Sequence, residues 1–548
     1  MKTRTMRCFG PIVAIGFSLW CVAGLWAQNS GTSTSTTTST STTTSTSTST
    51  STSTIPPGVI DEDSLFGGSK DIVTVIDEST ASAGTVQLVE DTKTYPVFLL
   101  SGTAGAGLYG NYTPVGSSSS DTQALYGAVN LSGLRIDYLP TKNLHFSISG
   151  DLLTVPDDII AASVTTFADL RHSELVRLYV AGSFNYDPSI DLSTYSLDEL
   201  FVDTHIDEKV FFRLGKQRIR WGVGYWYQPS DVLSLSAIDP DDPTAARDGP
   251  FAFKVDVPMN LNHLMVYMVP PVSGFAASSS IASKYDWIVN GWELSFGGYG
   301  RADMLARPRG IFSFTGAIGP FDVYGENVLL YGSDRIFVKE SSTSPGTFET
   351  YRRETAPFFQ STLGIKYSAG YSSGLSYSFH AQGYYNGTGY ADSSIMQNPS
   401  AIAAIKADYP DIYKDSASAA GAGMWYLAGS ASVSGRFGEG RNLTQVTGSL
   451  YALSNFSDRS LRFNPTLKVA IGDQGGRTTV TLSCLTAIGN MGSEYAPKGN
   501  RTTPALSFSA LNDVIELEVS APISLNTDFS VNKVQTAFSV FWNAVQFD

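Results

Sequence analysis

The feature that most constrains this fold is an alternation of apolar and polar residues with a period of two, recurring over residues 96–542. It is clearest in the segments 144–149, 176–186, 375–380 and 515–520. Successive side chains of a β-strand point to opposite faces, so each segment has one apolar and one polar face. After the N-terminal region, no run of about 18 apolar residues occurs, so the pattern does not indicate membrane-spanning helices.

The alternating segments are long, roughly 10 to 15 residues, against a usual strand length of about 5–6 residues in soluble proteins. A tilted strand needs about 9–11 residues to cross a bilayer. Charged residues make up 16% of the chain, below the roughly 25% of soluble domains. Within hydrocarbon, strands can pair all backbone groups only in a closed barrel. We therefore predict an all-β fold, a closed antiparallel transmembrane β-barrel of about 16–20 strands, a size that leaves an aqueous channel.

The N-terminus has the pattern of a secretory signal peptide. Lys2, Arg4 and Arg7 precede an apolar stretch at 11–22, and small residues lead to a cleavage site near Ala27. An almost pure Ser/Thr tract follows, which has no apolar surface to bury and is expected to be disordered. The predicted division is a signal peptide at 1–27, a Ser/Thr-rich linker at 28–57, an acidic extension at 58–94 and an outer-membrane β-barrel at 95–548.

Charge and cysteine content exclude several classes of function. The chain has 36 basic and 50 acidic residues, and removing the three basic residues of the signal peptide leaves 33 − 50 = −17. This balance argues against nucleic acid as a partner. Cys8 and Cys21 leave with the signal peptide, so Cys484 remains alone and the mature chain has no internal disulfide. No cofactor or metal is expected.

Connections between the strands divide into short turns and long insertions. Short turns at 140–143, 207–209 and 473–476 are expected to face the periplasm, and long insertions to face outward. The long insertions are 156–173, 218–250, 340–355 and 392–420, with short helices expected near 157–170 and 400–407. Aromatic pairs and triplets, Tyr109 and Tyr112, Tyr225 to Tyr227, and Tyr384 and Tyr385, are interpreted as interfacial girdles.

The segment 197–217 predicts a hairpin whose register follows from its apolar positions. Placing the apolar faces together requires a three-residue loop at 207–209. This register sets Asp203 opposite Arg213 and Glu199 opposite Gln217 on the polar face. Opposed charges stabilise a strand pair by about 0.2–1 kcal/mol. We predict a lumen-side pair between Asp203 and Arg213; the alternative is that both are separately solvated.

The segment 215–249 carries the most specific motif of the chain. The motif residues are Gly215, Lys216, Gln217, Trp221, Gly222, Pro229, Asp231, Val232, Asp239, Pro240, Asp242, Pro243, Arg247, Asp248 and Gly249. With the later segments 384–390 (YYNGTGY) and 455–460 (NFSDRS), this succession resembles a family of bacterial outer-membrane β-barrels that includes spirochaete porin-like proteins and, more distantly, alginate-export barrels. The resemblance implies a fold and an outer-membrane location, but no substrate.

Charged side chains of both signs are concentrated after the hairpin. They are Arg218, Arg220, Asp231, Asp239, Asp241, Asp242, Arg247 and Asp248. A loop of this kind folded into a barrel would narrow the pore and set its selectivity. The alternative is a loop attached to the barrel wall by its own ion pairs. A calcium site is a weaker interpretation, because the spacing does not match an EF-hand loop.

The sequence therefore predicts a porin-like channel for small solutes. Outer-membrane lipid and the barrel assembly machinery are the expected partners, and the sequence does not indicate an oligomeric state. The alternative is a plugged barrel that acts as a surface adhesin or structural anchor through its loops. An enzyme is not expected. The five histidines lie outside any nucleophile motif, and neither H-E-x-x-H nor G-x-S-x-G occurs.

Overall fold

The computed structural model describes most of residues 95–547. The gaps are 113–123, 156–157, 174, 188–191, 272–278, 304–305, 372–373, 410–417, 439–442, 473–476, 511–513 and 528. The expected signal peptide, linker and acidic extension lie outside the described residues, as does the turn at 473–476.

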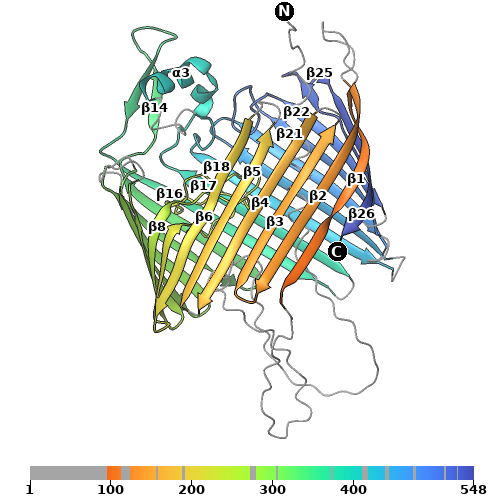
Figure 1. Ribbon diagram of the computed structural model, residues 1–548. Helices are drawn as coiled ribbons and strands as arrows, with labels where there is room; N and C mark the ends of the chain where they lie inside the picture. The colour runs from red at the N-terminus through yellow and green to blue at the C-terminus, as the bar shows by residue number, and fades with distance from the viewer. Residues whose placement is uncertain are drawn as a thin grey trace, which may run out of the picture. The chain divides into compact units, whose positions relative to one another are not determined.

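Over the described residues, 22 antiparallel strands close into a barrel, confirming the predicted fold class. Figure 1 shows these strands tilted across the barrel wall. The barrel strands are β1 Val97–Tyr112, β2 Ala124–Thr141, β3 Leu144–Val155, β4 Asp158–Ser173, β5 Val176–Asp187, β6 Leu192–Ile206, β7 Val210–Lys216, β8 Phe251–Met259, β9 Asn262–Val269, β10 Ser280–Val289, β11 Trp292–Arg301, β12 Arg309–Ile318, β13 Phe321–Tyr331, β16 Pro357–Gly370, β17 Leu375–Asn386, β18 Trp425–Phe437, β19 Thr444–Asn455, β20 Ser460–Ile471, β21 Thr478–Ile488, β22 Arg501–Ala510, β23 Ile515–Ser520 and β26 Thr536–Phe547. Each strand pairs with the next barrel strand along the chain, and β26 pairs with both β23 and β1.

The remaining elements lie in connections between barrel strands. They are the hairpin of β14 Ile336–Glu340 and β15 Phe348–Arg352, the 3-10 helix η3 Ser393–Gln397, the helix α3 Pro399–Asp408, and the hairpin of β24 Ile523–Leu525 and β25 Val531–Val534. The helix expected near 400–407 is thus confirmed. Figure 1 shows α3 and β14 beyond one rim of the barrel. Among the described residues, no helix is long and apolar enough to cross a membrane.

The barrel has more strands than the 16–20 expected, and one expected insertion is among them. Residues 158–173, interpreted as a loop with a short helix, form β4, which pairs with β3 and β5 along nearly its whole length. The segment is rich in Ala, Ser and Thr, which give little contrast between two strand faces. The prediction was wrong because small residues weaken the period-two signal on which it depended.

The two ends of the barrel differ in the length of their connections. The end at which β1 begins and β26 finishes has short turns, such as Asn290–Gly291, where both residues have positive φ, 50° and 77°. Asn-Gly is the favoured sequence for such a two-residue hairpin turn. The expected three-residue turn at 207–209 is present at this end as well. The other end carries the long connections 217–250, 332–356 and 387–424.

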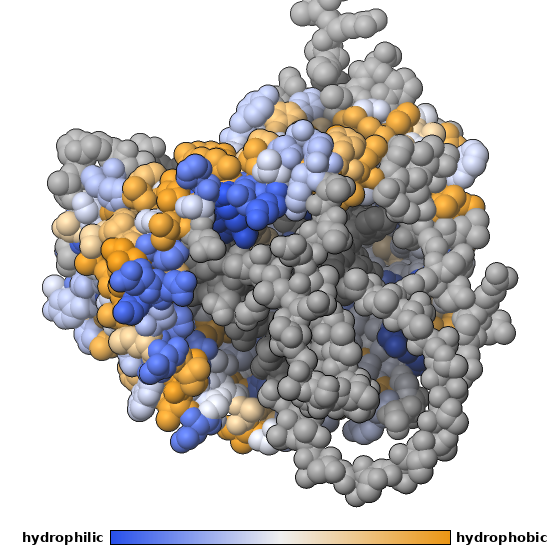
Figure 2. Space-filling view, turned by 60° about the horizontal axis from the view of Figure 1, so that its bottom comes forward, coloured by the Kyte–Doolittle hydropathy of each residue, from blue (hydrophilic) through white to orange (hydrophobic). Residues whose placement is uncertain are grey.

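The barrel is apolar outside and polar inside. Leu363, Leu427 and Leu482 are among the apolar side chains exposed on the outer face, whereas Glu326 and Gln382 on the inner face are fully buried. Figure 2 shows hydrophobic residues distributed around the barrel flank. This distribution is the reverse of a soluble protein and is typical of strands that face lipid outside and a polar lumen inside.

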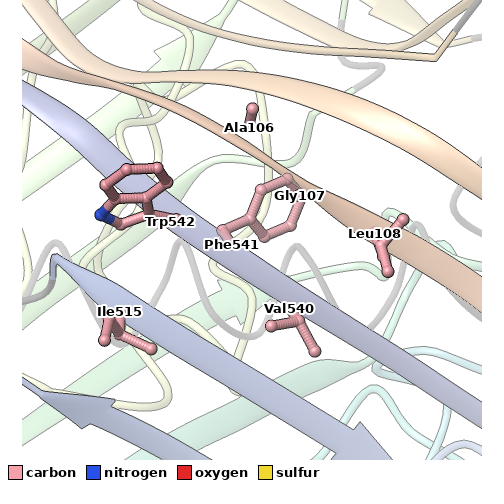
Figure 3. Close-up of a pocket in the computed structure, with 7 residues that line it drawn as sticks. All are labelled: Ala106, Gly107, Leu108, Ile515, Val540, Phe541 and Trp542. Carbon is pink, nitrogen blue, oxygen red and sulfur yellow. The ribbon is translucent and has the colours of Figure 1, made fainter.

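The barrel closes where β26 lies between β23 and β1. The outer surface of this seam has an apolar pocket, shown in Figure 3. Its lining residues are Ala106, Gly107, Leu108, Ile515, Val540, Phe541 and Trp542. A Cβ at Gly107 would lie 2.0 Å from the carbonyl oxygen of Val540. Glycine at this position therefore permits the close pairing of the first and last strands.

Candidate functional site

The connection Arg218–Pro250, which we call the inward loop, folds into the barrel. It leaves the wall where the backbone N–H of Gln217 donates to the carbonyl of Pro250 over 3.1 Å. The buried side chain of Gln217 donates to the carbonyl of Ala252 over 3.0 Å. The N–H of Arg218 donates to the Glu199 carboxylate over 3.2 Å. The two ends of the loop are thus held side by side at β6 and β8.

A carboxylate on another part of the wall holds the middle of the inward loop. Glu326 of β13 is 0% exposed. Its two carboxylate oxygens accept hydrogen bonds from the N–H of Gly224 over 2.5 Å and the N–H of Ser230 over 2.9 Å. A buried N–H left without an acceptor costs about 1–3 kcal/mol, so both backbone groups depend on this side chain. Glu326 therefore serves as a fixed anchor for residues 224–230.

An amide on β17 provides a second anchor for the inward loop. Gln382 is also 0% exposed, and its side-chain oxygen accepts from the N–H groups of Tyr225, over 3.0 Å, and Trp226, over 2.8 Å. Its side-chain nitrogen donates to the carbonyl of Tyr227 over 2.7 Å. One glutamine thus binds three consecutive backbone groups and fixes the conformation of this short segment.

The tip of the inward loop reaches the opposite wall. The Tyr451 hydroxyl on β19 donates to the carbonyl of Pro240, and Arg462 on β20 pairs with Asp241. In the ring of 22 strands, β19 and β20 lie almost half-way round from β7 and β8, between which the loop begins and ends. The inward loop therefore crosses the lumen from one wall to the other.

Ion pairs within the segment brace the inward loop. Arg247 pairs with Asp231, whose side chain is 1% exposed, and donates to the side-chain oxygen of Gln228 over 2.7 Å. Burial raises the pKa of Asp231, and the neighbouring charge of Arg247 opposes that shift. At the loop ends, Lys216 pairs with Asp248 at 2.8 Å. The inward loop therefore has ion pairs of its own and also lies across the lumen.

The other residues singled out in this segment have mainly positioning contacts. Arg220 donates to the carbonyl of Pro243 over 3.3 Å. Asp239 accepts from the N–H of Asp241, and Asp242 accepts from the Thr244 hydroxyl, both over 2.9 Å. Trp221 is buried against Tyr267, and Gly222 lies against Glu326 and Gln228. Pro229 occupies a turn in which the N–H of Asp231 donates to the carbonyl of Gln228.

The predicted pair in the middle of the hairpin is present. Arg213 donates to Asp203 over 2.6 and 3.0 Å, and its guanidinium lies 3.9 Å from the ring centroid of Phe201. The strand pairing sets Asp203 opposite Arg213 but ends at Leu200 and Lys216. Gly215, which faces Phe201 across the strands, has a φ of 137°, and a Cβ there would lie 2.0 Å from the Leu200 carbonyl. Close strand contact at this point therefore requires glycine.

One expectation about the aromatic residues was wrong. Trp226 and Tyr227 are 1% and 6% exposed and lie inside the barrel, where Tyr227 stacks on Tyr384. Tyr385 packs beside an exposed outer side chain, that of Trp425. The side chains of Tyr109 and Tyr112 lie outside the described residues. The segment around Trp226 belongs to the inward loop and so meets the lumen wall instead of the lipid interface.

Loops at the same end form a second hydrogen-bond network around Glu494. Its carboxylate accepts from the N–H of Gly421 over 3.0 Å, the hydroxyl of Tyr426 over 3.0 Å and the side chain of Asn455 over 2.9 Å. The N–H of Glu494 donates to Asp458 over 2.8 Å. The network joins residues of the NFSDRS segment to two other connections. It also touches the inward loop, because the Tyr227 hydroxyl lies 2.8 Å from that of Tyr495.

Titration of Glu494 is expected to loosen this network. Burial raises its pKa from 4.5 to about 7. Stability from the protonated carboxyl is therefore fully present below about pH 4.5 and is lost as pH rises through about 7, with a total on the order of 3 kcal/mol. Hydrogen exchange at residues 489–500, corrected for its intrinsic pH dependence, should be faster at pH 8 than at pH 5. Glu494→Gln should remove this difference, whereas Glu208→Gln in an exposed turn should preserve it.

Sequence reasoning missed the residues that anchor the loop. Glu326, Gln382, Tyr451 and Arg462 lie on strands far along the chain from the inward loop. Their inward positions follow from the alternation, but no local pattern indicates which loop they bind. Among the described residues, no group of three or more His, Cys, Asp or Glu side chains is arranged to hold a metal ion.

No protein-family model and no curated protein matches this sequence. Solved structures give several matches at low identity. Wzi from Escherichia coli, described as a carbohydrate-binding β-barrel of the outer membrane involved in group 1 capsule assembly, is 12% identical, with 81% of this chain and 84% of that chain covered and a TM-score of 0.32. OccAB1 from Acinetobacter baumannii is 9% identical, with 81% and 95% covered and a TM-score of 0.32. The siderophore receptor PirA from the same organism is 7% identical, with 81% of each chain covered and a TM-score of 0.38. These TM-scores are too low to transfer a property to this chain.

The strands and the inward loop of this chain define a closed transmembrane-type β-barrel whose lumen is crossed by a connecting loop.

Proposed function

We propose that this protein is an outer-membrane, porin-like channel in which small solutes pass beside the inward loop. The supporting observation is that part of the inner wall remains polar and uncovered by described residues. Ser376, Ser378 and Ser507 alternate with outward apolar side chains and are exposed. A polar, solvated inner wall is the property of barrels that conduct water and solutes.

The inward loop would set the width and charge of that path. It carries acidic and basic side chains across the lumen, and its anchors Glu326 and Gln382 fix its position. Fixed charges at a constriction discriminate among solutes. We infer no catalytic step, and the five histidines, all on barrel strands, enter the proposal only as wall residues.

The remaining parts of the proposal concern location and partners. Transmembrane barrels of bacteria lie in the outer membrane with short turns in the periplasm, so the end bearing the turns at 207–209 and 290–291 is assigned to that side. The signal peptide would be cleaved near Ala27 during export. Outer-membrane lipid would surround the apolar outer face, and the barrel assembly machinery would insert the chain. The proposal also includes the resemblance of the motif at 215–249 to spirochaete porin-like barrels, which implies the same fold and location.

Liposome swelling tests the proposal directly. The mature protein is reconstituted into liposomes, which are then diluted into isotonic solutions of arabinose, glucose and sucrose. A channel should give swelling whose rate falls steeply with solute size. Liposomes carrying heat-modifiable, folded protein that swell no faster than empty liposomes would contradict it.

A plugged anchor or adhesin is the second candidate. One observation favours it: the long connections bind each other at one end of the barrel. Arg335 donates to the carbonyl of Gly421 over 3.0 Å, and Glu494 joins its own connection to those of Gly421 and Asp458. Absence of swelling would shift the assignment to this candidate.

A further inference from the structure

Five arginines gather at the end of the barrel that carries the long connections. This arginine cluster consists of Arg307, Arg309, Arg335, Arg352 and Arg353. Its residues come from the β11–β12 connection, the start of β12 and the connection between β13 and β16. The chain as a whole has 50 acidic and 36 basic residues, so a local excess of positive charge is contrary to its overall balance.

Shared carboxylates join three of the five arginines, Arg307, Arg309 and Arg352. Asp334 accepts from the N–H of Arg307 over 2.6 Å and pairs with the Arg309 guanidinium. Glu354 pairs with Arg307 at 3.1 Å and with Arg352 at 3.3 Å. Asp334 and Glu354 thus pair with the guanidinium groups of Arg307, Arg309 and Arg352, whereas Arg335 donates to the carbonyl of Gly421 and Arg353 lies against an aromatic ring.

The arginines are more buried than their counter-ions. The side chains of Arg307 and Arg309 are 11% and 12% exposed, whereas those of Asp334 and Glu354 are 37% and 51% exposed. Exposed carboxylates in water compensate a buried cation only weakly. The two carboxylates therefore compensate the buried guanidinium groups of Arg307 and Arg309 only in part.

The Nε of Arg307 and the Nη1 of Arg335 are buried guanidinium nitrogens that lack an acceptor among the described residues. The other terminal nitrogen of Arg335 donates to the carbonyl of Gly421 over 3.0 Å, which fixes the direction of the guanidinium plane. A buried donor without an acceptor costs about 1–3 kcal/mol. Buried donors of this kind call for an acceptor that the described residues do not supply, such as a bound ion.

The cluster extends from the loops to the lumen wall. Arg309 is the first residue of β12, and its strand parity is that of Ser313, which is 1% exposed on the inner face. Arg353 lies against aromatic rings, with its guanidinium 4.2 Å from the centroid of Phe337. This contact holds Arg353 without using a carboxylate.

We propose that the arginine cluster binds the anionic group of a solute, a phosphate, sulfate or carboxylate, at the loop end of the barrel. The guanidinium fork matches the geometry of these oxyanions. The inference rests on the proposed channel function for the claim that the bound solute then enters the lumen. Binding itself is independent of conduction.

Titration calorimetry of the mature protein in detergent tests the binding. Inorganic phosphate, sulfate and citrate are the probes, and glucose is the uncharged control. We expect binding of at least one anion, no binding of glucose, and an affinity that weakens several-fold between about 50 and about 200 mM NaCl because the attraction is screened. The anion that binds most tightly identifies the class of group recognised.

Single substitutions locate the site. Arg335→Gln and Arg353→Gln should each weaken binding about tenfold, whereas Arg436→Gln, on an exposed side chain at the opposite end of the barrel, should change it by less than twofold. Arg335→Lys preserves the charge but not the fork and should give an intermediate loss. Heat-modifiability on gels verifies folding of each variant.

The proposal is overturned if folded wild-type protein binds none of the anions, or if Arg436→Gln weakens binding as much as the cluster variants. Swelling without anion binding would contradict the anion site but support the channel. Anion binding without swelling would support the site but contradict the channel.

Discussion

Replacing Glu326 by alanine is expected to release the inward loop from the lumen wall. The carboxylate accepts the backbone N–H groups of Gly224 and Ser230, at 2.5 and 2.9 Å, in a fully buried position. A buried N–H left without an acceptor costs about 1–3 kcal/mol, so losing both acceptors should cost about 2–6 kcal/mol of loop anchoring. Trypsin should then cleave at arginines of the loop, such as Arg220, at least a hundredfold faster. The measurement is the cleavage rate of reconstituted protein.

Two further variants separate anchoring from general damage to β13. Thr362 lies directly opposite Glu326 on β16, is buried, and its hydroxyl has no partner among the described residues. Thr362→Ala should therefore preserve the slow cleavage of the wild type. Glu326→Gln retains one acceptor oxygen and should give an intermediate rate. Equal protection in Glu326→Ala and wild type would show that this carboxylate does not hold the loop.

A charge placed on the outer face of the barrel is expected to cost far more than the same charge on the inner face. Leu482, in the middle of β21, is 49% exposed on the outer face. Arginine on the lipid-facing surface costs about 2–4 kcal/mol near the bilayer midplane. Leu482→Arg should lower the free energy of unfolding in lipid by that amount, measured by reversible denaturant titration.

The neighbouring residue supplies the matched control. Thr481 precedes Leu482 on the same strand and has the opposite, inward parity, facing Ser507 and Lys468 across the adjacent strands. Thr481→Arg should change the unfolding free energy by less than about 1 kcal/mol, since the lumen is polar. If both substitutions are equally costly, or neither is, then the assignment of the two faces to lipid and lumen is wrong.

The sequence predicted those features that depend on neighbouring residues. The hairpin around Asp203 and Arg213 followed from the parity of a few apolar positions and the length of one turn, both local properties. The closed barrel followed from the same alternation repeated along the chain. The segment of β4 was misassigned because its small residues are typical of neither the apolar nor the polar face of a strand.

Features that join distant segments could not be predicted in this way. Glu326 and Gln382 bind the inward loop from strands separated from it by more than 95 and 150 residues respectively. A buried glutamate on an inward position indicates a partner but does not identify it. The same limit applies to Trp226, whose aromatic neighbours suggested a membrane interface until the path of the loop placed it inside the lumen.

The central claim is that solutes cross this barrel through a lumen narrowed by the inward loop, and single-channel conductance tests it most directly. The N–H of Gln217 and the carbonyl of Pro250 are 3.1 Å apart, so a short Gly-Ser turn can replace the loop residues between Arg218 and Pro250 without moving β7 or β8. In planar bilayers the full chain should give stable steps, and the variant should give steps several times larger. Steps of equal size, or silence from both folded proteins, would contradict a loop-narrowed channel.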